Sequence, residues 1–189
     1  MMNSKSKILE RLGSQTKSAK RPLPEWESST FDGDLEAHFT TAIQANKGQV
    51  MELADFEIWM TKQVFQTILC LSKHFQEEKS IALPSDAHDL AHLNLAILDG
   101  QFGTAENGAI WLEDDNLQLR AIPFITEHLV VFLSRKNLVS DMHAAYAKIQ
   151  ESKAGFGLFL AGPSKTADIE QSLVIGAHGS KSLLVVWHD

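Results

Sequence analysis

Apolar residues follow two different spacings along this chain, one typical of amphipathic helices and one typical of buried strands. Helical spacing, with apolar side chains three or four positions apart, runs through residues 34–46, 55–77 and 140–151. Strands are predicted by the alternating pattern of residues 49–53 and by nearly continuous apolar runs over residues 81–83, 93–98, 128–133, 155–160 and 182–187. Strands that are apolar on both faces and alternate with helices predict an α/β fold with a mostly parallel sheet and helices on its faces.

The pattern changes between residues 105 and 133, where one strand follows another without a long helix between them. A turn over residues 105–108 precedes an apolar strand at 109–112, and residues 117–121 are expected to pair with that strand as a hairpin. This stretch therefore adds an antiparallel element to the mostly parallel sheet.

The first 33 residues differ from the rest of the chain. Residues 4–12 have the apolar spacing of a short helix, whereas residues 13–33 are polar and contain the prolines and glycines of a linker. We therefore expect an N-terminal helix and linker arm over residues 1–33 and one domain over residues 34–189.

Charge and composition exclude several classes of function. The net charge of −7 argues against broad binding to a phosphate backbone, which needs clustered lysine and arginine. Cys70 is the single cysteine, so the chain can form neither an internal disulfide nor a thiolate-held iron–sulfur cluster of its own. No apolar run approaches the roughly 18 residues that a membrane span needs. The sequence predicts a soluble, cytoplasmic protein that binds neither nucleic acid nor membrane.

Two histidines stand at a spacing that metal sites use. His88 and His92 would lie one turn apart on a helical face, as the zinc ligands of metalloproteases do. Asp89 stands where those enzymes carry glutamate, and the sequence offers no obvious third ligand. We expect two surface histidines and no metal site.

The most distinctive stretch covers residues 159–179, with the pattern of a strand end, a sharp polar turn, a short helix and a second turn. The backbone N–H groups and dipole of a helix that starts there could bind a small anion. The alternative is capping without a ligand, in which Ser164 or Thr166 caps the helix and Asp168 or Glu170 completes a capping box.

Nucleotide-hydrolase and serine-hydrolase motifs fit this turn poorly. A Walker A loop requires glycine where the chain has Phe159 and Ser164, and a nucleophile elbow requires glycine in place of Thr166. Nucleotide hydrolysis is therefore not supported.

Two further polar residues lie in turns that contain glycine. Glu106 could act as a general base, a nucleophile or an anchor for a substrate hydroxyl, or its turn could be ordinary turn chemistry with an Asn-Gly pair. His178 is flanked by glycines and could approach a ligand closely, or it could hydrogen-bond a backbone carbonyl.

Three stretches together resemble the LUD-domain family, and within it the lactate-utilisation protein C branch, also called LutC or YkgG. Residues 162–170 (GPSKTADIE) are similar to a turn of that branch, with Arg or Lys at the fourth position. Residues 176–179 are similar to its C-terminal Gly-x-His-Gly turn, and residues 105–108 to its Ala-Glu-Thr-Gly turn. The similarity extends over residues 34–189.

The chain departs from the pattern of this branch at three positions. Lys165 stands where arginine is usual, Asn107 where threonine is usual, and Ser180 where proline usually follows the His-Gly pair. Lysine lacks the bidentate fork of arginine, so we expect either that the geometry of a bound ligand differs or that the protein serves a divergent operon.

The resemblance implies a three-layer α/β fold like those of NagB, ribose-5-phosphate isomerase A (RpiA) and the CoA transferases, with a site carried on loops. It also implies a role in oxidising L-lactate to pyruvate beside two iron–sulfur proteins, one LutA-like and one LutB-like. Because this chain has too few cysteines, the clusters are expected on those partners, and no cofactor is expected in this chain.

The resemblance also implies which residues form the site. A small anionic ligand is expected to bind at Gly162, Ser164, Lys165, Thr166, Asp168 and Gly179. Glu106 and His178 are expected to face the same cleft and are the catalytic candidates. Two alternatives remain: a stand-alone enzyme of this fold, acting on an acyl-CoA or a sugar phosphate with Glu106 as nucleophile or base, and a non-catalytic scaffold.

Overall fold

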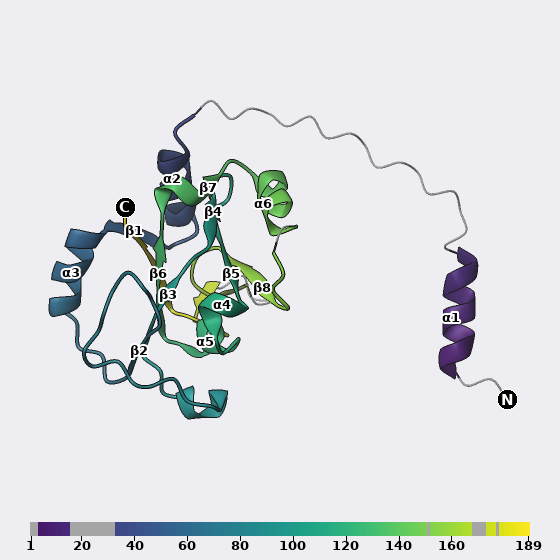
Figure 1. Ribbon diagram of the computed structural model, residues 1–189, viewed down its shortest axis with the longest axis horizontal. Helices are drawn as coiled ribbons and strands as arrows, with labels where there is room; N and C mark the ends of the chain where they lie inside the picture. Colours follow the sequence, from purple (N-terminus) through teal and green to yellow (C-terminus); the bar gives the residue numbers. More distant parts are fainter. Residues whose placement is uncertain (1–3, 16–32, 151, 168–172, 177) are drawn as a thin grey trace. The chain divides into compact units, whose positions relative to one another are not determined.

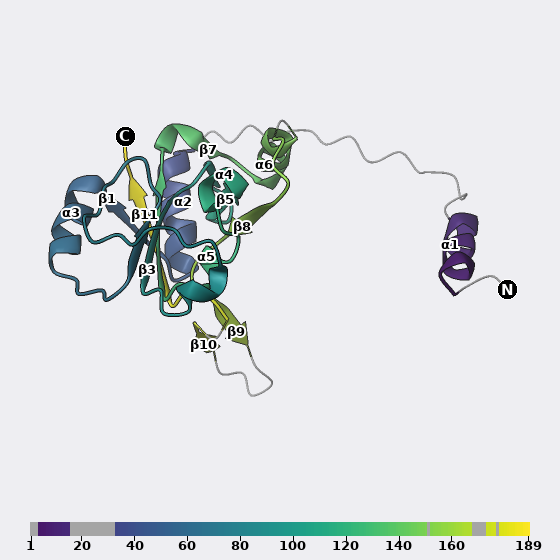
Figure 2. The same ribbon diagram turned by 60° about the horizontal axis from the view of Figure 1, so that its bottom comes forward.

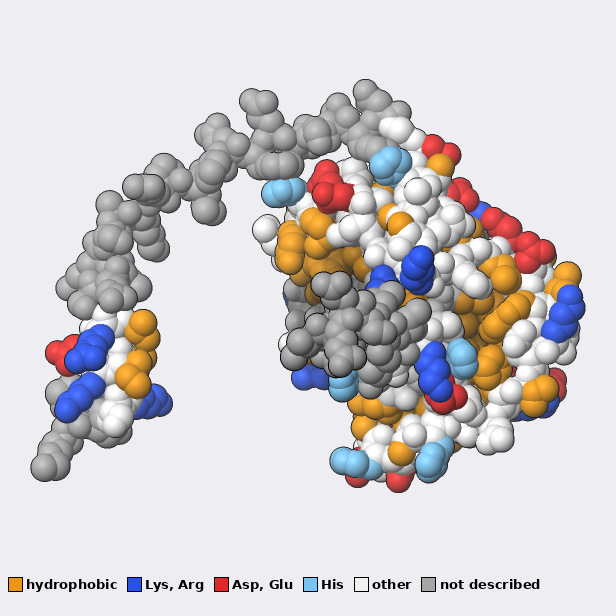
Figure 3. Space-filling model, turned by 180° about the vertical axis from the view of Figure 1, so that it is seen from behind, with side chains coloured by type: hydrophobic (Ala, Val, Ile, Leu, Met, Phe, Trp, Pro, Cys, Tyr) orange, Lys and Arg blue, Asp and Glu red, His pale blue; other side chains and the backbone are white. Residues whose placement is uncertain are grey.

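The computed structural model describes residues 4–15, 33–150, 152–167, 173–176 and 178–189. The chain divides into two compact units, Met1–Thr30 and Phe31–Asp189. The first contains α1 (Ser4–Gln15), whose exposed apolar side chains gather on one side of the helix in Figure 3. Every other described element belongs to the second unit, which is the domain discussed below.

A five-stranded sheet forms the centre of the domain, and all of its strands are parallel (Figure 1). Its strands in spatial order are β1 (Gln49–Glu52), β11 (Ser182–Trp187), β6 (His128–Leu133), β3 (Leu95–Asp99) and β2 (Ile68–Cys70). The two longest, β6 and β11, pair over their full length from Ser182 beside His128 to Trp187 beside Leu133.

A second sheet has mixed directions. Its order is β7 (Leu138–Val139), β4 (Phe102–Thr104), β5 (Ala109–Glu113) and β8 (Gly157–Leu160). The strand β5 is antiparallel to both β4 and β8, whereas β4 and β7 are parallel. After β8 comes an antiparallel hairpin of β9 (Lys165–Ala167) and β10 (Leu173–Ile175), which projects from the domain in Figure 2.

Helices and the second sheet cover the two faces of the parallel sheet (Figures 1 and 2). On one face lies α3 (Leu53–Thr61), and on the other lie α2 (Leu35–Ala45) and the four-stranded sheet. The shorter helices are α4 (Asp114–Leu117), α5 (Ile122–Ile125), α6 (Met142–Ile149) and two 3₁₀ turns, Ala87–Leu90 and Arg135–Asn137.

Two apolar clusters hold these layers together, and the alternation of side chains along each strand divides residues between them. In β6, Val130 and Phe132 belong to the cluster under α3, whereas Leu129, Val131 and Leu133 belong to the cluster under α2 and the second sheet. Burial on both faces explains why the strands of this sheet are continuously apolar.

The structure confirms the α/β class, the mostly parallel sheet and the antiparallel element. The last strand has the expected bounds at Ser182–Trp187, and Asp34 caps α2 by accepting hydrogen bonds from the N–H groups of Glu36 and Ala37. None of the helices in the described residues is long and apolar enough to cross a membrane.

The prediction of one long helix over residues 55–77 is wrong. The helix α3 ends at Thr61, and residues 68–70 form β2 beside β3 instead. A short apolar run has no periodicity that separates a buried strand from a helical face, and here pairing with β3 decides for the strand.

Two shorter predictions are also wrong. Residues 81–83 form no strand, because only Ser80 makes a bridge to Ile68 and Ile81 is left 37% exposed. Residues 117–121 do not pair with 109–112, since a capping box at Glu113 starts α4 directly after β5. The hairpin partner of β5 is β4, on the other side of the turn at residues 105–108.

Candidate functional site

The turn after β8 packs against the C-terminal end of α2. Gly162 has φ +83° and is buried, and a Cβ atom at this position would lie 2.4 Å from the backbone oxygen of Asn46. A residue without a side chain is therefore required here both for the backbone conformation and for the close approach.

The backbone that follows this turn is a strand over residues 165–167, where the sequence predicted the start of a short helix; the rest of that predicted helix, residues 168–172, lies outside the described residues. Residues 165–167 form β9, in which Thr166 pairs with Val174 of β10. No helix N-terminus lies at Ser164 or Thr166, so neither helix capping nor an anion site on a helix N-terminus describes this turn. Asp168, the remaining predicted ligand-binding residue of this stretch, lies outside the described residues.

The loop before β11 holds Ser164 from two sides. The N–H of Ser164 donates to the carbonyl of Ser180 at 2.8 Å, and the carbonyl of Ser164 accepts from the N–H of Gly176 at 3.0 Å. Gly179 approaches the Ser164 side chain so closely that an added Cβ would lie 3.1 Å from the serine Cβ. The structure thus brings the predicted residues Ser164 and Gly179 together, and the exposed His178 lies in the same loop.

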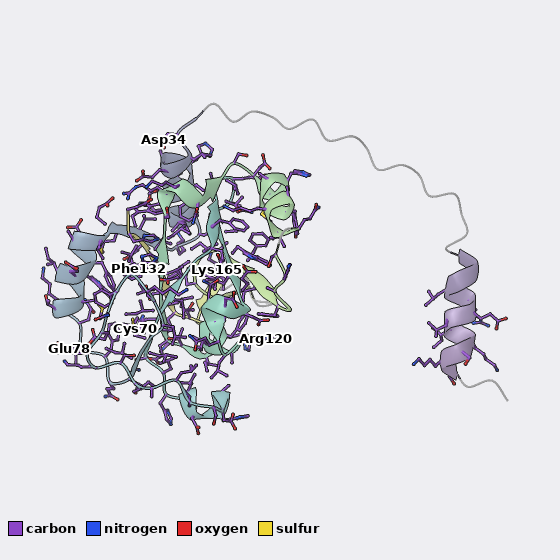
Figure 4. All side chains as sticks on the ribbon, viewed as in Figure 1. Asp34, Cys70, Glu78, Arg120, Phe132 and Lys165 are labelled. Carbon is purple, nitrogen blue, oxygen red and sulfur yellow. The ribbon has the colours of Figure 1, made fainter. Side chains whose placement is uncertain are left out.

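Asn46, which follows α2, joins the turn after β8 to the turn after β4. Its Nδ2 donates to the carbonyl of Asn107 at 2.9 Å, and its Oδ1 accepts from Lys165 Nζ at 3.3 Å. Gly108 brings the second turn onto α2, because its φ is +69° and an added Cβ would lie 2.8 Å from the backbone nitrogen of Ile43. Figure 4 labels Lys165 among the side chains of this region.

Glu106 is directed toward α6. Its Oε2 accepts a hydrogen bond from the N–H of Met142 at 3.0 Å, in the first turn of that helix. The carboxylate therefore complements the helix N-terminus together with Asp141, the N-cap residue. This contact gives Glu106 a structural role, and its catalytic role stays a prediction.

Two lysines near these loops have different electrostatic partners. Lys181 Nζ lies 2.7 Å from Glu127 Oε1, and this contact, with a further hydrogen bond from Asn94, lowers the pKa of the Glu127 carboxyl. Lys165 instead contacts the neutral amide of Asn46, and none of the ion pairs between described residues involves it. The charge of Lys165 is thus left uncompensated by the described side chains around it.

The remaining candidates from the sequence are two histidines and the single cysteine. His88 and His92 are exposed, and the described residues contain no group of three or more metal-ligating side chains. Asp86 accepts a hydrogen bond from the His88 ring at 2.7 Å, which raises the pKa of His88. Cys70 is half-buried, and burial raises the pKa of its thiol.

Asn46 is a residue of this region that the sequence does not reveal. The pattern of residues 34–46 predicts only the end of a helix there, because the partners of Asn46 lie 61 and 119 positions further along the chain. The sequence shows only that Asn46 is a polar residue at the end of a predicted helix. It does not show that the fold places this helix end next to glycine-containing turns. No local spacing identifies such partners.

Comparisons with known proteins agree with this architecture. The sequence model of the LUD domain matches residues 36–187. A relative from Geobacillus kaustophilus named lactate utilization protein C is 36% identical over 100 residues, which are 50% of this chain and 41% of the relative. A Bacillus mycoides relative named lactate utilization protein C 1 is 34% identical over 92 residues, covering 46% of this chain and 39% of the relative. The matched stretch thus spans about two fifths of these curated relatives.

A solved structure shares the fold. The crystal structure of a DUF162 family protein from Deinococcus radiodurans superposes with a TM-score of 0.56 at 14% sequence identity, over 81% of this chain and 95% of that chain. At this identity the similarity establishes the fold alone. The match of the domain model over residues 36–187 establishes the family: this chain belongs to the LUD-domain family.

Proposed function

We propose that this chain is the non-cluster subunit of an iron–sulfur system that oxidises L-lactate to pyruvate, and that its loops bind a small anionic ligand. The observation that carries the proposal is the meeting of Ser164, Lys165 and the turn with His178 and Gly179 beside the end of α2. The relatives named lactate utilization protein C support the assignment to lactate metabolism.

The chemistry of these side chains suits a carboxylate. An ammonium, a hydroxyl and an imidazole can all donate hydrogen bonds, and charge-assisted bonds to a carboxylate are among the stronger polar contacts in proteins. Glu106, whose negative charge would repel such a ligand, is directed toward α6 instead of this surface. Lys165 would bind the carboxylate group of lactate, and Ser164 and His178 would contact its hydroxyl.

Electron transfer is assigned to the partner proteins in this proposal. Removal of two electrons and two protons from L-lactate gives pyruvate, and Cys70 alone cannot hold an iron–sulfur cluster to accept those electrons. LutA-like and LutB-like proteins would carry the clusters, and this chain would contribute substrate binding or assembly.

Deletion of the gene followed by growth on L-lactate as sole carbon source tests the proposal. We expect deletion to abolish growth, the wild-type gene to restore it, and Lys165→Ala to restore it poorly because the cation that binds the carboxylate is lost. Lys62→Ala is the matched control, because Lys62 is an exposed lysine at the end of α3. Its growth should equal wild type.

A pull-down with a tagged full-length chain tests the assembly. We expect cysteine-rich proteins with bound iron and acid-labile sulfide to co-purify, identified by mass spectrometry and iron analysis. Unimpaired growth of the deletion strain together with an empty pull-down would contradict the proposal.

A further inference from the structure

Asn46 contacts both turns that build the lysine side of the site, the turn after β4 and the turn after β8. Its amide bonds to the carbonyl of Asn107 and to Nζ of Lys165, and its backbone oxygen lies against Gly162. Its own N–H donates to the carbonyl of Ala42 at 3.0 Å, at the C-cap position of α2. Asn46 is therefore fixed by the helix on one side and by two turns on the other.

The orientation of this amide follows from its partners. An asparagine amide carries two donor hydrogens on nitrogen and an acceptor oxygen on the other side. The carbonyl of Asn107 accepts a hydrogen bond and cannot donate one, so the nitrogen of Asn46 must face it. The oxygen is then left for the ammonium of Lys165, which can only donate.

The electrostatic consequence is that Asn46 holds the Lys165 ammonium in place without bringing an opposite charge next to it. The C-terminal end of α2 carries a partial negative charge from its carbonyl groups, which favours a cation there. The Asn46 amide adds an acceptor but no net charge. One hydrogen bond to Asn46 uses one of the three N–H donors of the ammonium. A carboxylate at position 46 would instead neutralise the lysine, as Glu127 does for Lys181.

We propose that Asn46 is the positioning and selectivity residue of this site. It holds Lys165, which has no ion-pair partner among the described residues, beside Ser164, and it thereby selects small carboxylates of the 2-hydroxy acid class over neutral analogues. This inference rests on the proposed function in one respect, that the ligand of the site is a small carboxylate. The placement of Lys165 by Asn46 does not depend on that ligand.

The test compares three variants of the full-length chain. Asn46→Asp keeps the size of the side chain and places a negative charge at Lys165, whereas Asn46→Ala removes the hydrogen bonds without adding charge. Gln44→Glu is the matched control, because it adds the same charge to the same end of α2 on an exposed side chain two positions away. Thermal unfolding identifies any variant that does not fold.

Two measurements are made on each variant. Titration calorimetry with L-lactate, and with L-lactamide as the neutral analogue, reports ligand binding. Mass spectrometry reports the rate at which a dilute acylating reagent modifies Lys165 Nζ, which reacts only as the free amine. We expect Asn46→Asp to weaken lactate binding and to slow modification of Lys165, each about threefold, because an ion pair with the exposed ammonium competes with the ligand and holds the proton. Asn46→Ala should weaken binding a few-fold and speed modification, and Gln44→Glu should match wild type.

The two measurements separate failure of this inference from failure of the proposed function. If wild type does not bind L-lactate but Asn46→Asp slows modification and Asn46→Ala speeds it, the ligand assignment fails and the positioning role stands. If Lys165 is acylated at the wild-type rate in the Asn46 variants, the inference is overturned. It is also overturned if Gln44→Glu changes binding and acylation as much as Asn46→Asp does. Should Asn46→Asp not fold, the modification rate of Asn46→Ala decides alone.

Discussion

At the scale of single residues, the site depends on backbone positions that only glycine can occupy. Gly162 and Gly108 both have positive φ, and each brings a turn against the last residues of α2. The amino-acid sequence alone predicts a site within residues 162–179, because the polar and glycine residues that resemble known turns are close together there. It does not predict Asn46, whose contacts are made only after the chain has folded.

The first prediction concerns Gly162→Ala. An added Cβ would lie 2.4 Å from the Asn46 oxygen at a φ of +83°, so we expect the free energy of unfolding to fall by about 2–4 kcal/mol. Urea denaturation followed by circular dichroism measures this change. Gly155→Ala is the control, because its nearest atom would be 3.4 Å away and its backbone needs no glycine, so its stability should change by less than about 0.5 kcal/mol. Equal effects of both substitutions would contradict the role assigned to Gly162.

At the scale of elements, capping side chains determine where helices begin. Asp34 caps α2, and Asp141 caps α6 by accepting a hydrogen bond from the N–H of Ala144 at 2.9 Å. Such signals are local in sequence, which explains why the start of α2 is predictable from the residues. That residues 68–70 and 165–167 form the strands β2 and β9 is not predictable in this way, because a strand forms by pairing with residues that can be distant in sequence.

The second prediction concerns the acid stability of α6. The hydrogen bonds from the Ala144 N–H and the Ser140 hydroxyl lower the pKa of the Asp141 carboxyl below its ordinary value of 3.8. The cap therefore stabilises the fold above the unfolded-state pKa and is lost as pH falls through the lower folded-state pKa. We expect the stability of wild type to decline more steeply than that of Asp141→Asn below about pH 4, because asparagine caps without titrating.

Thermal unfolding between about pH 2.5 and 7 measures this difference across the acid range. Asp141→Ala serves as the control, because it lacks the cap at every pH and should be less stable than wild type by about 1 kcal/mol at neutral pH. Parallel pH profiles for wild type and Asp141→Asn would show that Asp141 does not contribute to the acid response.

At the scale of the whole molecule, stability depends on apolar side chains that join the layers. Phe56 of α3 is fully buried, and its ring meets those of Phe75 and Phe132 edge-on at centroid distances of 5.0 and 5.4 Å. Phe132 lies in β6 at the middle of the parallel sheet, and Figure 4 labels it. These rings belong to the apolar cluster through which α3 covers that face.

The third prediction concerns Phe56→Ala. Removing a buried ring leaves a cavity between α3 and the sheet, so we expect the free energy of unfolding to fall by about 3–5 kcal/mol. Chemical denaturation measures the loss. Ile58 lies on the same helix and is 54% exposed, so Ile58→Ala should lower the free energy of unfolding by less than about 1 kcal/mol. A small effect of Phe56→Ala would mean that α3 is not held by this cluster.

The sequence by itself determined the α/β class, the central strands β3, β6 and β11, the cap of α2 and the family to which the chain belongs. The class, the strands and the cap are set by local composition, because a strand that is buried on both faces must be apolar throughout and a cap bonds to its own helix. The family was indicated by the resemblance of residues 162–170, 176–179 and 105–108 to its turns. Only the tertiary structure decided that residues 68–70 and 165–167 are strands, since each needs a partner strand to satisfy its backbone hydrogen bonds. Only the tertiary structure, likewise, placed Asn46 between Lys165 and Asn107, because packing of α2 against two distant turns creates that contact.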